Sequence, residues 1–347
     1  MFSLRISDVN NEPNEFTDFN GKKARASKLD DNNSSSFDTS SRSTTNDMNV
    51  KDGVNHGKRK ISHVDGKIER LKLQRKILKE TDNDGANIKM PIAVMYKYDH
   101  ESDVTTRRYV YIDKRSDGPS EFVIESTSDS EFFEPIPLLT QRQVWRCYIS
   151  GKSGSGKSTR IAELVDNMRD LNKTINNVVM FNANNIADPA YERLGVRVMD
   201  YEKVKLLEVM QVEDFKNSII IFDDWDQIVG PNSSALIKHM RKFLKAVLER
   251  GRKFNVHALV VSHQTMDFLK TRDIISECES CALFPAMNRR NTFKFIKEYL
   301  DDSKGVTEMA RKLAAGSYGT NEYDMLYVNK AVPMYAVSDK AIRIFND

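Results

Sequence analysis

The sequence predicts an α/β fold with a parallel central sheet, preceded by a disordered arm and a small β-rich extension. From Val144 onward, short apolar segments typical of buried strands alternate with amphipathic segments typical of helices. A glycine-rich loop joins the first of these strands to the first helix, and a later apolar strand ends in two carboxylates. With 347 residues, of which 39% are hydrophobic, the chain can build at least one good core.

The bulk composition excludes several classes of protein. No window approaches the roughly 20 continuous apolar residues of a membrane span, and no signal peptide is recognisable, so we expect a soluble, intracellular, cytoplasmic protein. Three cysteines cannot form a disulfide framework, and we expect Cys278 and Cys281 to be buried residues rather than metal ligands. A formal charge of +3 gives no general case for nucleic-acid binding, which must rest on where the cations cluster.

The composition changes along the chain and predicts four segments. Residues 1–57 are a polar, disordered arm, because Asn, Ser, Asp and Thr dominate and few aliphatic residues occur. Residues 58–90 form a basic amphipathic helix and linker, which could bind a partner helix or DNA, act as a localisation signal, or only face solvent. Residues 91–140 are a small β-rich extension, and residues 141–347 are the main domain.

The individual elements follow from periodicity and turn residues. In the extension, strands are expected over Pro91–Tyr98, Thr105–Asp113 and Glu121–Ser126. In the main domain, strands are expected over Val144–Ser150, Asn177–Phe181, Val196–Met199, Ser218–Phe222, Val256–Ser262, Cys281–Phe284, Asp324–Val328 and Met334–Val337. Helices are expected over Ser158–Asp170, Tyr201–Met210, Ser234–Arg250, Thr292–Leu300 and Thr307–Ala314.

The glycine-rich loop has the residue types that bind a polyphosphate. Glycines let successive backbone N–H groups point at phosphate oxygens, and the following helix adds the positive end of its dipole. Lys157 would reach the β and γ phosphates, and the Ser158 hydroxyl would ligate Mg²⁺. The expected phosphate-binding residues, which match a P-loop (Walker A), are Gly151, Lys152, Ser153, Gly154, Ser155, Gly156, Lys157, Ser158 and Thr159.

The second element of the site is the apolar strand that ends in Asp223 and Asp224. Downstream of a P-loop, Asp223 is expected to hold the magnesium of a bound Mg²⁺–ATP as the Walker B carboxylate. Asp224 stands where many such enzymes carry the residue that activates the attacking water; alternatively, it only supports the groups around the metal. Together the two elements predict a P-loop ATPase domain over residues 141–347.

The third element follows the strand Val256–Ser262. A polar side chain at the carboxyl end of a strand beside Walker B can contact the γ-phosphate or its water, and Gln264 is the candidate. His263 could share that role, although a hydrogen-bonded histidine at a strand end is the simpler interpretation.

These motifs in this order resemble the FtsK–HerA superfamily of P-loop ATPases. The resemblance rests on the Walker motifs, on Arg250 and Arg252 followed by Phe254-Asn255-Val256, and on the strand that ends in Ser262-His263-Gln264. Within the superfamily the order is similar to the genome-packaging ATPases of large and mid-sized eukaryotic DNA viruses, the poxvirus-like group.

The resemblance implies an additional-strand, RecA-like domain and a homo-oligomeric ring that moves double-stranded DNA by ATP hydrolysis, with capsid or other packaging proteins as partners. It also implies an arginine that completes the neighbouring subunit's site. Arg250 and Arg252 are the candidates for this catalytic role, followed by Arg289 and Arg290.

A cationic stripe on the segment Ser234–Arg250 gives a separate reason to expect DNA. Apolar residues recur there at core spacing, while four cations share the other side. Such a stripe suits a phosphate backbone, although a solvated helix face would look the same. The stripe consists of Lys238, Arg241, Lys242 and Lys245.

Two other functions use the same loop. A small-molecule kinase would carry an arginine-rich lid, and no such segment is recognisable. A nucleotide-gated binding or anchoring module with little turnover would need only part of the set Lys157, Ser158, Asp223 and Gln264. The signatures of ABC-type ATPases and of GTPases are both missing.

Overall fold

The computed structural model describes residues 2–6, 16–17, 23–24, 90–100, 104–114, 121–126, 128–137, 144–183, 188–199, 210–230, 232–263, 265, 271–301, 303–317 and 323–345. The predicted basic helix in 58–90, almost all of the predicted arm, and the predicted helix Tyr201–Met210 up to residue 209 lie outside these residues. Within residues 8–61, β2 (Phe16–Thr17) and β3 (Lys23–Ala24) form a short antiparallel pair.

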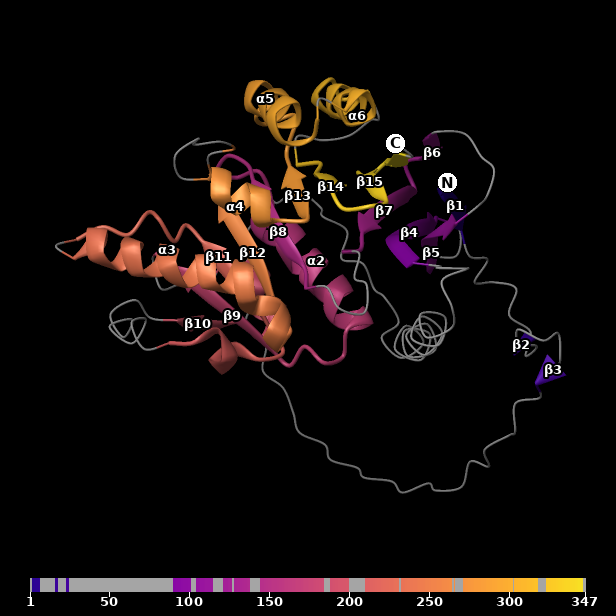
Figure 1. The fold of residues 1–347 in the computed structure, drawn as a ribbon. Helices are drawn as coiled ribbons and strands as arrows, with labels where there is room; N and C mark the ends of the chain where they lie inside the picture. Colours follow the sequence, from indigo (N-terminus) through magenta and orange to yellow (C-terminus); the bar gives the residue numbers. More distant parts are fainter. Residues whose placement is uncertain are drawn as a thin grey trace, which may run out of the picture. The chain divides into compact units, whose positions relative to one another are not determined.

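A large sheet organises the main domain (Figure 1). Among the described residues its ten strands are, in spatial order, β10 (Arg197–Met199), β9 (Asn177–Asn182), β11 (Ser218–Asp223), β12 (Val256–Ser262), β8 (Arg146–Ser150), β13 (Ser280–Leu283), β14 (Leu326–Asn329), β15 (Met334–Val337), β16 (Ala341–Phe345) and β6 (Glu121–Glu125). Neighbours from β10 to β13 run parallel, and those from β13 to β6 run antiparallel. The predicted parallel central sheet is confirmed, and an antiparallel half extends it.

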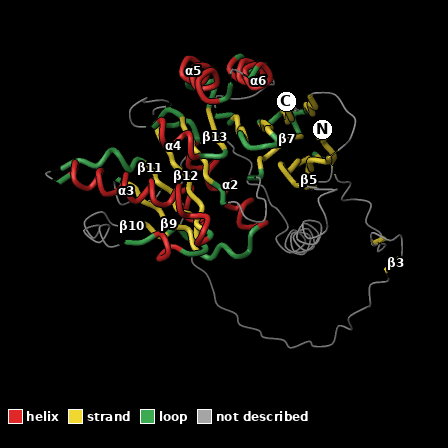
Figure 2. The backbone as a smooth tube through the Cα atoms, in the orientation of Figure 1, coloured by secondary structure: helices red, strands yellow, loops and turns green. Residues whose placement is uncertain are grey.

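The strand order identifies the additional-strand class of P-loop fold. The chain leaves β8 through the glycine loop, yet β8 pairs with β12 rather than with β11, the strand that ends in the carboxylates. Strand β12 therefore lies between β8 and β11, which Figure 1 labels, and Figure 2 shows the strands of this sheet in yellow. Parallel strands end at one edge, so the segments after β8, β11 and β12 meet there.

Helices cover both faces of this sheet. The described helices are α2 (Lys157–Leu171), α3 (Ser233–Arg250), α4 (Arg272–Glu277), α5 (Arg289–Tyr299) and α6 (Lys304–Ala314), with 3₁₀ turns η2 (Pro189–Leu194), η4 (Val212–Phe215) and η5 (Gly251–Phe254). Figure 1 shows α3 and α4 lying across β11 and β12, and α5 beside α6. Successive side chains of β11 point to opposite faces of the sheet, so the strand contributes to the core on both faces. Ile220 and Phe222 join the core under α3, while Ile219 and Ile221 join the core under α2.

The predicted β-rich extension contributes to two sheets. Two of the expected strands, β4 (Met90–Asp99) and β5 (Val104–Lys114), form an antiparallel hairpin, flanked by β1 (Phe2–Ile6) and β7 (Glu131–Pro135) in a four-stranded sheet. Strand β6 instead pairs with β16 and belongs to the large sheet. The four-stranded sheet shares the core under α2, to which it contributes Ile92, Val110 and Phe133.

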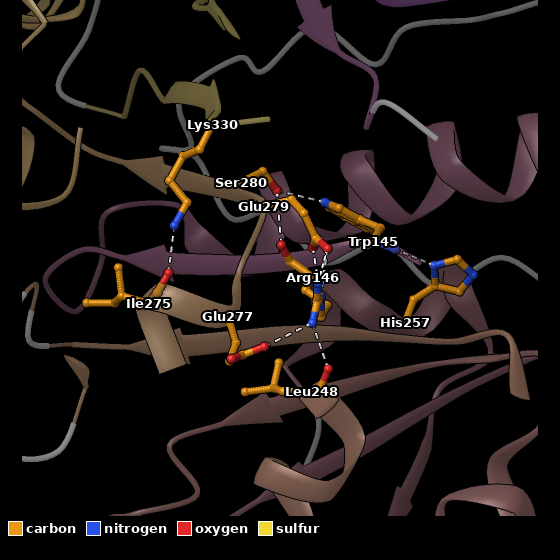
Figure 3. A network of polar contacts seen from close by, with 9 residues as sticks. All are labelled: Trp145, Arg146, Leu248, His257, Ile275, Glu277, Glu279, Ser280 and Lys330. Carbon is orange, nitrogen blue, oxygen red and sulfur yellow. Dashed lines mark hydrogen bonds and ion pairs between the residues drawn. The ribbon is translucent and has the colours of Figure 1, made fainter. Parts of the chain in front are cut away.

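A polar network joins the amino ends of β8, β12 and β13 (Figure 3). The backbone N–H of Trp145 donates to His257 Nδ1 (2.9 Å), and its indole N–H donates to Ser280 Oγ (3.1 Å). Arg146 Nε donates to both carboxylate oxygens of Glu279 (2.9 and 3.0 Å). The network ties three adjacent strands together at the edge opposite the glycine loop.

In the part of the chain that the structure describes, no helix is both long and apolar enough to cross a lipid bilayer. Cys147, Cys278 and Cys281 are free thiols and buried, as expected for Cys278 and Cys281. Burial raises the pKa of the Cys278 thiol to about 12, so this side chain stays a neutral, unreactive thiol near neutral pH.

Candidate nucleotide site

The glycine loop between β8 and α2 adopts a conformation that depends on its glycines. Gly154 and Gly156 have φ angles of 77° and 80°, which side chains other than glycine rarely adopt. A Cβ at Gly151 would lie 2.5 Å from Ser155 Oγ and 2.7 Å from the Phe284 ring. The loop is anchored to β12, because the Gly151 N–H donates to Ser262 O (3.2 Å).

Lys157 is the first residue of α2 and is only 8% exposed. Its Nζ donates to the carbonyl oxygens of Gly151 (2.9 Å) and Lys152 (3.0 Å) and lies 3.2 Å from His263 Nδ1. Burial lowers the pKa of this ammonium, while the negative charges of Asp223 and Asp224 act in the opposite direction. The lysine thus lies folded against the loop, within reach of any anion that the loop binds.

The predicted phosphate-binding residues form the loop and the start of α2, and they differ in exposure. Gly151, Ser155 and Lys157 are buried, Gly156 and Ser158 are half-buried, and Lys152, Ser153, Gly154 and Thr159 are exposed. Because α2 is 15 residues long and begins at Lys157, its first N–H groups are directed at the same place.

Asp223, the last residue of β11, is 8% exposed and lies at the edge where the glycine loop begins. Burial raises the pKa of its carboxyl to about 6; the neighbouring Asp224 adds to the effect, and the Lys157 ammonium opposes it. Two adjacent carboxylates at the end of a buried strand repel each other, and a divalent cation would offset that repulsion. The residues present therefore fit a magnesium ion.

Asp224 follows with a φ angle of 49°, the left-handed region that is uncommon for residues other than glycine. Its carboxylate oxygens lie 2.8 and 2.9 Å from His263 Nε2. His263 therefore lies between the predicted water-activating carboxylate and the P-loop lysine. The sequence offered His263 only as a residue that could share the role of Gln264 and did not indicate its contacts with Lys157 and Asp224, since a strand end alone does not reveal what faces the side chain that follows it.

Three buried hydroxyls beside the site have no hydrogen-bond partner of acceptable geometry among the described residues. They belong to Ser150, the last residue of β8, to Ser155 within the loop, and to Tyr191, which is fully buried in η2. Burial and the charge of Asp223 raise the pKa of Tyr191, while the Ser158 hydroxyl lowers it. Unsatisfied buried hydroxyls are costly, and a polar ligand bound at this edge would supply partners for them. No local pattern pointed to Tyr191.

Other predicted residues lie away from this edge or outside the described part. Gln264 falls outside the described residues. Arg250 and Arg252 are exposed at the end of α3 and in η5, directly before β12 begins, so the length of a strand, about 20 Å, separates them from the glycine loop. Arg289 and Arg290, by contrast, are exposed at the start of α5, which follows the carboxyl end of β13.

The cationic stripe on α3 faces solvent. Lys238, Arg241, Lys242 and Lys245 are all exposed, whereas the other side of the helix is buried. Lys245 also forms an ion pair with Glu249 (3.7 Å), which leaves the other three cations as the more strongly positive part of the stripe.

Comparison with known proteins gives one sequence relative and several distant structural likenesses. No family model matches the chain. An uncharacterized protein of the Sputnik virophage is 29% identical over 197 residues, which cover 55% of this chain and 74% of that protein.

Among solved structures, the genome packaging NTPase of Sulfolobus turreted icosahedral virus 2 in complex with AMPPCP is similar with a TM-score of 0.37 and 14% identity, covering 57% of this chain and 97% of that chain. The pCW3 conjugation coupling protein TcpA with ATPγS has a TM-score of 0.41 and 10% identity, covering 80% of this chain and 82% of that chain. Likeness at this level carries no argument about activity.

Proposed function

We propose that this protein is an ATPase that uses hydrolysis to move double-stranded DNA, and that it serves the packaging of a viral genome. The observation that supports the ATPase most strongly is the position of β12 between β8 and β11. It brings the glycine loop, the two carboxylates and the residue after β12 to one edge of the sheet. The motif resemblance supports DNA as the substrate of the motor, and the virophage relative agrees with a viral setting.

In this proposal the chain's own groups bind and orient the nucleotide. The N–H groups of the loop and of the α2 terminus bind the phosphates, and Lys157 turns from the carbonyls of Gly151 and Lys152 to the β and γ phosphates. Ser158 and Asp223 would hold magnesium, which supplies charge neutralisation at the transferred phosphoryl group. Asp224 is adjacent and can accept a proton from the attacking water.

A magnesium site of this kind needs few protein ligands. Among the described residues, no group of three or more His, Cys, Asp or Glu side chains is gathered for a metal ion. Magnesium bound with a nucleotide usually takes one or two protein ligands, and phosphates and waters complete its shell. Ser158 and Asp223 are sufficient for that arrangement.

Hydrolysis measured with and without duplex DNA tests the proposal and separates it from its rivals. We expect single-turnover ATP hydrolysis that duplex DNA accelerates. Asp224→Asn should keep nucleotide binding and slow hydrolysis by on the order of 10²-fold or more. Phosphate transfer to a small acceptor would identify a kinase instead, and binding without turnover would identify an anchoring module.

The α3 stripe can be tested for DNA binding with a matched control. Charge reversal of all four stripe residues, Lys238, Arg241, Lys242 and Lys245, should weaken duplex binding and lower the slope of log Kd against log salt concentration. The control reverses four exposed cations on α5 and α6, namely Lys294, Lys297, Lys304 and Arg311. Equal weakening of DNA binding by both variants would show that only the net charge matters, and that the α3 stripe does not contact DNA.

Arg250 and Arg252 can serve a nucleotide only in another subunit, because a strand length separates them from their own loop. If either is the arginine that completes a neighbouring site, mixing an inactive Arg250→Ala or Arg252→Ala variant with inactive Lys157→Ala should restore hydrolysis in mixed rings. Electron microscopy with duplex DNA and a non-hydrolysable ATP analogue tests the ring itself. A monomer under those conditions would contradict the motor.

A further inference from the structure

We propose that His263 is a positioning residue that ties Lys157 to Asp224 in the nucleotide-free protein and reports phosphate binding to the water-activating carboxylate. The inference rests on the proposed ATPase function and extends it. It assigns a specific task to a side chain for which the sequence favoured an ordinary structural role.

The contacts of His263 fix the form of its ring. Lys157 Nζ, 3.2 Å from Nδ1, is an ammonium and can only donate, so Nδ1 must carry the lone pair. The neutral ring then has its proton on Nε2, which lies 2.8 and 2.9 Å from the two carboxylate oxygens of Asp224 and donates to them. A continuous donor chain therefore runs from Lys157 through the imidazole to Asp224.

Strand register explains why His263 reaches both groups. In β12, Ser262 lies opposite Ser150 of β8, and Val261 lies opposite Asp223 of β11. The next residue after Ser262 is therefore level with the first residues of the glycine loop on one side and is close to Asp224 on the other. Only the additional strand occupies this place between the two Walker motifs.

A bound nucleotide would break one half of this chain and leave the other. Phosphate oxygens are anionic, so their hydrogen bonds to Lys157 are stronger than the bond from Lys157 to a neutral ring nitrogen. When Lys157 turns to the phosphates, Nδ1 loses its donor, while Nε2–H still holds Asp224. The His263 ring is then held only by Asp224, so the orientation of the Asp224 carboxylate changes with the ring. Nucleotide binding at the glycine loop is in this way linked to the position of the carboxylate.

The left-handed backbone of Asp224 makes such support necessary. A non-glycine residue at φ 49° persists only where its surroundings hold it, and the bond to His263 is one such restraint. The His263 side chain is 37% exposed, so its removal leaves no large buried cavity. A variant at this position should therefore fold and report on function.

Kinetics with two substitutions tests the role. We expect His263→Ala to lower kcat by on the order of 10²-fold, because a displaced catalytic group costs about that much. The Kd of a non-hydrolysable ATP analogue should stay within about threefold of wild type, because the loop and Lys157, which bind the phosphates, are unchanged. His263→Gln, whose amide carries one donor and one acceptor, should recover part of the rate. In the background of Asp224→Asn, His263→Ala should have no further effect.

A readout independent of turnover follows the ring itself. In ¹⁵N spectra of labelled histidine, the nucleotide-free wild type should show a proton on Nε2 of His263 and a hydrogen-bonded lone pair on Nδ1. The Nδ1 resonance should shift when the ATP analogue binds. Nucleotide-free Lys157→Met should already show the shifted value.

The outcomes separate this inference from the proposed function. If the wild type binds no ATP analogue, the ATPase proposal fails first. If it binds and hydrolyses ATP, a wild-type kcat in a folded His263→Ala variant, or a proton on Nδ1, overturns the role of His263 alone. Equal losses in His263→Ala and His263→Gln would likewise contradict the donor–acceptor role.

Discussion

The two edges of the parallel strands both hold buried polar side chains, but they differ in how completely these side chains are paired. At the amino edge, Arg146 donates to Glu279, Glu277 and the Leu248 carbonyl, and Trp145 uses both of its N–H groups. At the carboxyl edge, Asp223 and Asp224 crowd each other and the Tyr191 hydroxyl has no good partner. The paired side chains of the amino edge stabilise the fold, whereas the carboxyl edge has incompletely paired polar groups that can bind a ligand.

The largest effect should come from Lys157→Ala at the carboxyl edge. Removing the ammonium should lower ATP hydrolysis by more than about 10³-fold and abolish tight nucleotide binding, because the main positive charge for the phosphates is lost. Lys152→Ala is the matched control, since Lys152 contributes to the loop through its backbone and its exposed side chain should be dispensable. Isothermal titration with an ATP analogue measures binding, and equal behaviour of the two variants would contradict the assignment.

A change at the amino edge should affect stability without affecting the nucleotide. Arg146→Met keeps the aliphatic stem but leaves Glu279 and the Leu248 carbonyl without their donor, so we expect a loss of about 3 kcal/mol in the free energy of unfolding. Denaturant unfolding measures the loss. Nucleotide affinity of the folded fraction should remain at the wild-type value, and a parallel fall in affinity would show that the two edges are coupled.

Parts of this arrangement could be predicted from the sequence because their signals are local. The glycine loop, the carboxylates at the end of β11, and the helices α2 and α3 follow from spacing within a few residues. The expected main-domain elements that the structure describes lie within three residues of the observed bounds. The expected β8, for example, began at Val144, and the observed strand begins at Arg146.

Other parts could not be predicted, because their partners are remote in sequence. Strand β16 contains Arg343, which looks unsuited to a buried strand until Glu308 and the Gly305 carbonyl accept its hydrogen bonds. Strand β7 is acidic and ends at Pro135, so its composition did not indicate a strand. The pairing of Trp145 with His257 spans 112 positions, and the role of His263 likewise depends on which strands become neighbours.

The amino edge should also make stability sensitive to acid. His257 is fully buried with both ring nitrogens in hydrogen bonds, and burial lowers its pKa to about 4. The unfolded chain takes up a proton near the ordinary value of 6.5, so stability is complete above that pH and falls as the pH drops from 6.5 towards 4. Between pH 7.5 and 5 this histidine alone should cost about 2 kcal/mol.

The measurement compares the free energy of unfolding of wild type and His257→Gln at both pH values. Glutamine can keep one donor and one acceptor but does not titrate, so the acid-dependent loss should be smaller by that amount. A wild-type pH dependence in His257→Gln would assign the acid sensitivity to other groups.

The smallest expected effect is a gain in the free energy of unfolding, opposite in sign to the loss expected at the amino edge. Asp223→Asn removes a buried charge whose pKa is raised to about 6, which means that the folded, nucleotide-free protein disfavours the ionised carboxyl. At pH 7 we therefore expect the variant to be more stable than wild type by about 1 kcal/mol, after the cost of burying the amide. Magnesium should no longer improve its nucleotide binding. Thermal unfolding with and without Mg²⁺ and an ATP analogue measures both effects. A destabilised variant would show that the Asp223 carboxylate is already paired in the folded protein, as Arg146 and Glu279 are at the amino edge.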